Sequence, residues 1–150
     1  MRNLLASALL IGLVSAPAAA ANVSLSANLV NSCVLSIGSN GTMTAATTGT
    51  QIGSENSGGS SASLTMVAIG SLPTVTFAAP TLSSPAGWSA THTNSIRYTS
   101  SGGANQAYTS AQSTSTASAL TDTFTVHGKV DSAAGFAAGS YTLNTVVTCS

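Results

Sequence analysis

The sequence predicts an all-β protein, built as a single antiparallel β-sandwich. Apolar and polar residues alternate in several short segments, which is the period of a half-buried strand. Clusters of Gly, Pro, Asn and Ser separate these segments, as turns separate the strands of sandwiches. No window beyond the first 21 residues shows the periodicity of a helix. About seven to nine short strands are therefore expected.

The beginning of the chain predicts a secretory signal peptide over residues 1–21. Arg2 supplies the positive region, residues 4–14 the apolar region, and Pro17 with the alanines that follow it the cleavage site. Cleavage is expected after Ala20 or Ala21. No later segment approaches the ~20 apolar residues that span a bilayer. The sequence thus predicts a secreted protein.

Charge is scarce, since only 4% of the residues are charged against about 25% in a typical domain. Without Arg2, two basic residues face three acidic ones, a formal charge of −1. This balance excludes the basic footprint of a nucleic-acid-binding protein and a polybasic membrane patch. A surface with so little charge favours association with copies of itself.

The most regular alternation lies in residues 22–37, NVSLSANLVNSCVLSI. Its apolar members at odd positions are Val23, Leu25, Ala27, Leu29, Cys33, Leu35 and Ile37. At roughly 3.3 Å per residue one strand of this length would measure about 50 Å, too long for a small domain. Two interpretations remain: a bend near residues 30–32 divides it into two strands of one fold, or its first half pairs with another molecule.

The next part of the chain predicts an edge strand, a loop and a hairpin. Residues 42–50 are rich in threonine and suit a short edge strand, and residues 53–61 form a loop by composition. Residues 62–69 predict a central strand, because their second half is apolar on both faces. After a turn at residues 70–73, residues 74–78 are expected to be the hairpin partner of that strand.

The middle of the chain carries weaker signals. A short strand is expected at residues 88–93, with Trp88 filling the edge of the core. Ile96 and Tyr98 mark another strand. Residues 100–119 are nearly all small and polar, so they predict a long hairpin or an exposed loop.

Two strands end the chain. Residues 122–130 form the first, with Phe124 and Val126 facing inward and Gly128 as a possible bulge. After a loop at residues 131–139 comes a terminal strand. Four residues share one face of that strand: Tyr141, Leu143, Val147 and Cys149.

The two cysteines, Cys33 and Cys149, predict a disulfide, because an even pair in an exported protein is usually oxidised. In the chain-entropy model a bond that closes so long a loop contributes about 4 to 5 kcal/mol. Two separate free thiols are the alternative.

Groups for catalysis or metal binding are few. Two histidines, His92 and His127, cannot form a closed zinc site without carboxylates or thiolates. None of the many serines lies in a nucleophile-elbow context. Asp122 and Asp131 are too far apart along an extended chain to act as paired acids. The sequence therefore argues against an enzyme, and neither a cofactor nor a metal is expected.

Three segments carry a resemblance to a known family: VSLSANLVNSCVLSIG at residues 23–38, TFTVHGKV at residues 123–130 and AAGSYTLNTVVT at residues 137–148. Together they resemble the subunits of archaic chaperone/usher pili and the related spore coat protein U-like family of secreted bacterial proteins. Shared features are an alternating N-terminal strand that runs into a cysteine, a late V-x-G-x-V strand and a closing A-G-x-Y strand. The resemblance covers about half of the mature chain.

The resemblance implies an incomplete immunoglobulin-like sandwich over residues 32–150, with a groove where the last strand is missing. A periplasmic chaperone would fill the groove first, and the N-terminal segment of the next subunit would then replace it at an outer-membrane usher. By position, residues 22–31 would be this donor segment, with Val23, Leu25, Ala27 and Leu29 as donor side chains. The groove walls would be formed by Leu35, Ile37, Tyr141, Leu143 and Val147.

The expected function is a structural subunit of a bacterial surface fibre, a pilus or fimbria, with a role in adhesion or biofilm. One departure from the family leaves an alternative open. Family members usually pair their first cysteine with one in the middle of the chain, whereas the only partner of Cys33 is Cys149. A bond between the first and last strands would narrow the groove or shut one end of it. The alternative is a self-contained secreted β-sandwich, a coat protein or ligand-binding module that does not polymerise.

Overall fold

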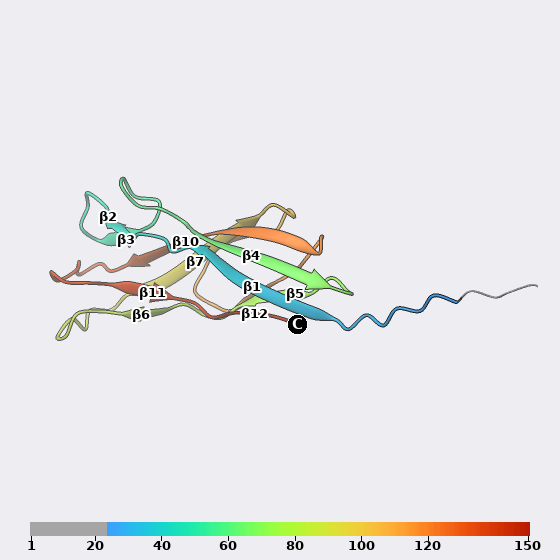
Figure 1. Cartoon of the computed structure of the whole chain (residues 1–150). Coiled ribbons are helices and arrows are strands. Elements are labelled where there is room, and N and C mark those ends of the chain that lie inside the picture. The colour runs from blue at the N-terminus through green and yellow to red at the C-terminus, as the bar shows by residue number, and fades with distance from the viewer. Residues whose placement is uncertain (1–23) are drawn as a thin grey trace, which may run out of the picture.

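The computed structural model describes residues 24–150, which form two layers of antiparallel strands (Figure 1). No helix occurs among these residues. The all-β prediction is confirmed, and the two layers are consistent with a sandwich. Twelve strands are present in the described part of the chain, more than expected, because several are only two to four residues long.

The first layer is a seven-stranded sheet built around one long strand, β10. On one side of β10 lie β4 and β3, and on the other lies β7; β1, β2 and β8 extend the sheet outward. The bounds of these strands are β1 Ser32–Ser39, β2 Thr44–Ala45, β3 Gln51–Gly53, β4 Ala62–Ile69, β7 Thr93–Ser100, β8 Asn105–Thr109 and β10 Thr121–Asp131.

The second layer consists of two smaller sheets. In one, β5 lies between β9 and β12; in the other, β6 pairs with β11. The bounds are β5 Thr74–Phe77, β6 Thr81–Ser83, β9 Ser113–Thr116, β11 Thr142–Asn144 and β12 Val147–Cys149.

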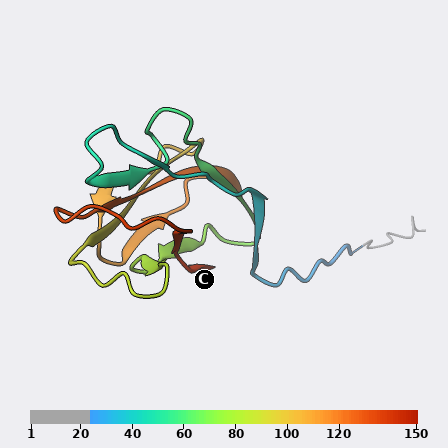
Figure 2. The ribbon, with the colours of Figure 1, turned by 90° about the vertical axis from the view of Figure 1, so that its left-hand side faces the viewer.

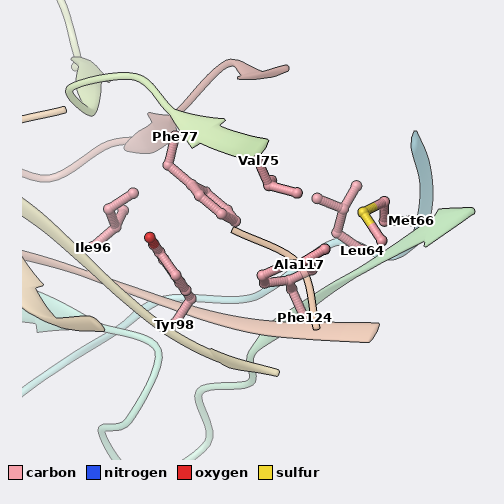
Figure 3. Close-up of a cluster of buried hydrophobic side chains, with 8 residues drawn as sticks. All are labelled: Leu64, Met66, Val75, Phe77, Ile96, Tyr98, Ala117 and Phe124. Carbon is pink, nitrogen blue, oxygen red and sulfur yellow. The ribbon is translucent and has the colours of Figure 1, made fainter. Parts of the chain in front are cut away.

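Between the layers lies a core of buried side chains (Figure 3). Its members are Leu64, Met66, Val75, Phe77, Ile96, Tyr98, Ala117 and Phe124. The rings of Phe77 and Tyr98 stack across the layers with centroids 4.0 Å apart, and Phe124 packs against both. Each fully buried large side chain contributes about 1.5 to 3 kcal/mol.

Strand β4 is central, as expected, because it pairs with β1 on one edge and β10 on the other. Its alternation is that of a strand with one covered face: Leu64, Met66 and Ala68 are buried, whereas Val67 and Ile69 are exposed.

The prediction that residues 62–69 and 74–78 form a hairpin is wrong, because these two strands do not pair. Both edges of β4 are already occupied, so the chain crosses at residues 70–73 to the other layer. There β5 pairs with β9 and β12, while Val75 and Phe77 face the core. Alternation predicts which side chains face inward, but it does not identify the strand that supplies the hydrogen bonds.

Three further expectations need correction. Residues 88–92 form no strand, and Trp88 is half-buried in a loop. Residues 100–119 contain two strands, β8 and β9, which belong to different layers. Gly128 forms no bulge, because the pairing of β10 with β7 is continuous there. A Cβ atom at Gly128 would lie 2.7 Å from Cδ2 of Leu143, so the glycine lets Leu143 approach the sheet.

The terminal strand is divided in two. Thr145 lies between β11 and β12 and donates a hydrogen bond from Oγ1 to the carbonyl oxygen of Ala78, 2.7 Å away. The expected alternation nevertheless persists across the break. Tyr141, Leu143, Val147 and Cys149 are half-buried, and the residues of the opposite phase are exposed: Thr142, Asn144, Val146 and Thr148.

Candidate strand-binding groove

The predicted disulfide is present and joins the edges of the two layers. Cys33 is the second residue of β1, and Cys149 is the last residue of β12. Their Cα atoms are 6.1 Å apart. The C-terminus consequently lies beside the start of β1 (Figure 1). The sandwich is therefore closed at this end of β1.

Beyond the disulfide the two layers separate and leave a groove of about 580 Å³. One wall comes from residues 37–43 and the other from residues 141–147, and β4, β7 and β10 form the floor. Its apolar lining consists of Ile37, Met43, Ala62, Leu64, Ile96, Val126, Tyr141, Leu143 and Val147. Every polar residue of the lining is uncharged.

Ile37 shows how the groove arises. It lies opposite Leu64 in the β1–β4 ladder and, by alternation, on the same face as Cys33 and Leu35. Leu35 is half-buried and packs against the core, but Ile37 is 73% exposed. Because no strand of the second layer covers this position, an inward-facing apolar side chain is left open to solvent.

The groove is flanked by strand edges without partners. Among the described strands, β1 pairs only with β4, β11 only with β6, and β12 only with β5. Each strand therefore has one edge whose N–H and C=O groups are free to pair with a further strand. An extended segment that entered the groove would meet apolar side chains below it and backbone partners at its sides.

Four of the five predicted wall residues line the groove: Ile37, Tyr141, Leu143 and Val147. Leu35 does not, because it lies nearer the disulfide and packs against the core. Met43, Ile96 and Val126 also line the groove but were not among the predicted wall residues. The inward phase of Val126 was visible in the sequence, but only the positions of the layers show that it faces a groove.

The described part of the predicted donor segment, residues 24–31, lies outside the sandwich. Residues 24–31 belong to no strand, and Figures 1 and 2 show them leading away from the start of β1. Leu25 is 96% exposed, and Ala27 and Leu29 are also exposed. Val23 and the predicted signal peptide lie outside the described residues.

Four charged side chains gather around Tyr108, away from the groove. Its hydroxyl donates to Glu55 over 2.7 Å, Glu55 also pairs with Arg97, and Lys129 pairs with Asp131 over 2.9 Å. The ring of Tyr108 lies within 6 Å of both cations. The hydrogen bond from Tyr108 and the Arg97 guanidinium lower the pKa of Glu55. Two cations balance two anions, so this cluster supports the fold rather than forming a charged binding site.

Asp122 is a buried carboxylate whose two oxygens both accept hydrogen bonds. Ser100 and Ser101 donate from Oγ over 2.7 and 2.8 Å, and the Gly102 amide donates over 2.8 Å. Burial by itself raises the pKa of Asp122, but these hydrogen bonds stabilise the anion and bring its pKa below the ordinary value. Its position explains why this acid does not pair with Asp131: it anchors the β7–β8 turn.

Within residues 24–150, no three His, Cys, Asp or Glu side chains are grouped so that they could hold a metal ion. In the same residues, no helix has the length and apolar character needed to cross a membrane.

Comparisons with protein-family models, curated proteins and solved structures gave no match. The fold and the groove define the class: an all-β protein with one disulfide and an uncharged, largely apolar groove between unpaired strand edges.

Proposed function

We propose that this protein is a structural subunit of a bacterial surface fibre, a pilus or fimbria, assembled by donor-strand exchange. One observation carries the proposal. The sandwich has an open groove between unpaired strand edges, while an alternating apolar segment of the same chain lies unused outside the fold. The occupant of the groove is residues 22–31 of a second copy.

The chemistry of the segment matches that of the groove. In an extended strand Leu25, Ala27 and Leu29 point to one side, about 6.6 Å apart, as groove-filling side chains must. No side chain of the segment or of the groove lining is charged. Strand addition combines main-chain hydrogen bonds with pockets for alternate side chains.

The proposal includes partners and a location. An open apolar groove with free strand edges invites aggregation, so a periplasmic chaperone would cover it until an outer-membrane usher joins the subunits. The disulfide suits an oxidising compartment such as the periplasm. The assembled immunoglobulin-like subunits would then form a fibre at the cell surface that serves adhesion or biofilm.

Charge placed on alternate faces of the donor segment tests the proposal. The double variant Leu25→Asp, Leu29→Asp puts carboxylates where the segment enters the apolar groove, and we expect it to abolish fibres. The matched variant Ser26→Asp, Asn28→Asp adds the same charge to the other face and should still assemble. Fibre length by electron microscopy of cells producing chaperone, usher and subunit is the measurement. Equal assembly of both variants would refute donor-strand exchange.

A second candidate is a ligand-binding module that does not polymerise. It is favoured by an aromatic group beside the groove, in which Trp88 stacks on Phe136 and both meet the edge of Tyr141. All three side chains are only half-buried. A purified protein that stays monomeric and does not bind a peptide of residues 22–31 would support this candidate.

A further inference from the structure

The disulfide leaves no room for a strand between β1 and β12. A strand inserted between two others holds them two inter-strand spacings apart, about 9.5 Å. The Cα atoms of Cys33 and Cys149 are only 6.1 Å apart. At this level the groove is closed, and neither cysteine belongs to its lining.

The chain's own donor segment departs at this closed end. It joins β1 at Ser32, one residue before the disulfide. To enter its own groove the segment would turn back near residues 30–32 and run beside β1, which takes it first past Cys33. The bridge between β1 and β12 occupies that path. The open part of the groove begins near Ile37, which lies about 13 Å from Cys33 along β1. It continues past the end of β1 to residues 40–43.

A polymerising subunit needs such a barrier. A segment tethered next to its own groove acts at an effective concentration in the millimolar range, well above the concentration of other copies. Without an obstacle, insertion within one chain would compete successfully with exchange between chains. The product would be a closed monomer with no free segment.

We propose that the Cys33–Cys149 disulfide reserves the groove for the N-terminal segment of a second copy, by closing the route through which the chain's own segment would insert. This inference rests on the proposed function, in which residues 22–31 are the occupant. The disulfide would then determine which segment can bind, in addition to stabilising the fold. The segment of the second copy would enter the groove at its open end, near Met43 and Tyr141.

A lengthened tether tests the inference with the disulfide intact. Twenty Gly and Ser residues inserted between Asn31 and Ser32 reach about 22 to 27 Å on average, enough to carry the segment to the open end. We expect this variant to be monomeric, to protect residues 24–31 from amide hydrogen exchange, and to bind a synthetic peptide of residues 22–31 at least tenfold more weakly than the unmodified chain. The control carries the same insertion with Leu25→Asp and Leu29→Asp, and should bind the peptide normally.

Removal of the bridge gives a second test. The variant Cys33→Ala, Cys149→Ala should protect its own segment at all protein concentrations, whereas the oxidised chain should leave the segment unprotected when dilute and monomeric. If this variant fails to fold, the lengthened tether decides.

The outcomes separate the two proposals. Protection of the segment in the dilute oxidised monomer overturns the inference, as does a long-tether variant that binds the peptide as well as the unmodified chain. If the oxidised chain with Leu25→Asp and Leu29→Asp, whose own segment cannot compete, does not bind the peptide, the proposed function itself is wrong.

Discussion

Ile37 and Leu64 are direct partners in the β1–β4 ladder, yet Leu64 is 7% exposed and Ile37 is 73% exposed. Both side chains are apolar and occupy the same face of the same sheet. The difference is the second layer, which covers Leu64 on the central strand β4 but not Ile37 on the edge strand β1. Ile37 is therefore an inward-facing apolar side chain that a strand of another molecule could cover.

We expect Ile37→Ser to weaken binding of the peptide of residues 22–31 by tenfold or more. Covering an exposed isoleucine contributes about 1.5 to 3 kcal/mol, which the serine largely forfeits. Stability of the isolated subunit should change by less than about 0.5 kcal/mol, because surface substitutions usually do. Fluorescence anisotropy of a labelled peptide measures the affinity.

The matched control is Val34→Ser in the same strand. Val34 is 59% exposed but lies on the outer face, opposite Val67. Peptide affinity should stay within twofold of the unmodified chain. If both substitutions weaken binding equally, the segment binds to the outer face of β1 or to no defined face.

Much of the fold follows from local pattern, and the part that does not is long-range pairing. Residues 62–69 are a central strand, as the apolar character of their second half predicts, but that pattern does not show that Val67 and Ile69 are exposed. The disulfide was predictable because each of the two cysteines has only the other to pair with. The alternation of Val75 and Phe77 with polar residues is compatible both with a hairpin to residues 62–69 and with a crossing to the other layer. Only the occupancy of both edges of β4 decides between them.

The groove was predictable to a similar degree. The phase of Ile37 and Leu143 indicates which way they face, but the phase cannot show whether a strand covers them. Leu35 has the same phase and is packed against the core. Strand β3 and the division of the terminal strand were missed because segments of three residues are too short to show a period.

Asp122 should make the fold sensitive to acid. Its native pKa lies below the ordinary value, about 3.9, that it regains on unfolding. The unfolded chain therefore binds the proton more readily, so the stabilisation is complete above about pH 5 and is lost as the pH falls through the native pKa. We expect Asp122→Asn to lower the free energy of unfolding by about 1 to 3 kcal/mol at pH 7, since the amide cannot accept from Ser100, Ser101 and Gly102 together.

Urea unfolding at several pH values measures this effect. The gap between Asp122→Asn and the unmodified chain should shrink below pH 4. Asp131→Asn is the control. The Asp131 side chain is more exposed, and among the described residues it has two partners, Gln51 and Lys129, so the substitution should cost less than about 1 kcal/mol. If both substitutions lowered the free energy of unfolding equally, the hydrogen bonds of Asp122 to the β7–β8 turn would have no particular importance for stability.

The Tyr98 hydroxyl is buried with no hydrogen-bond partner among the described residues, although its ring stacks on Phe77. Tyr98→Phe keeps the ring and removes the unpaired oxygen. We expect the free energy of unfolding to rise by about 1 kcal/mol, because an unsatisfied buried polar group costs about 1 to 3 kcal/mol. In the control Tyr141→Phe, the lost hydroxyl donates to the carbonyl oxygen of Ala137 over 3.0 Å, and stability should not rise. A loss of stability in Tyr98→Phe would reveal an ordered water on the hydroxyl.

Reduction of the disulfide should lower the free energy of unfolding by about 4 to 5 kcal/mol in the chain-entropy model. The bond joins residues 116 positions apart, so it restricts almost the whole unfolded chain. Urea unfolding with and without reductant measures the loss, and the Cys33→Ala, Cys149→Ala variant should be unaffected by reductant. A loss below about 1 kcal/mol would mean that packing of Leu35 and Val147 against the core is enough to hold the two edges together. The bond's main contribution would then lie in closing the groove at that end, and its effect on stability would be secondary.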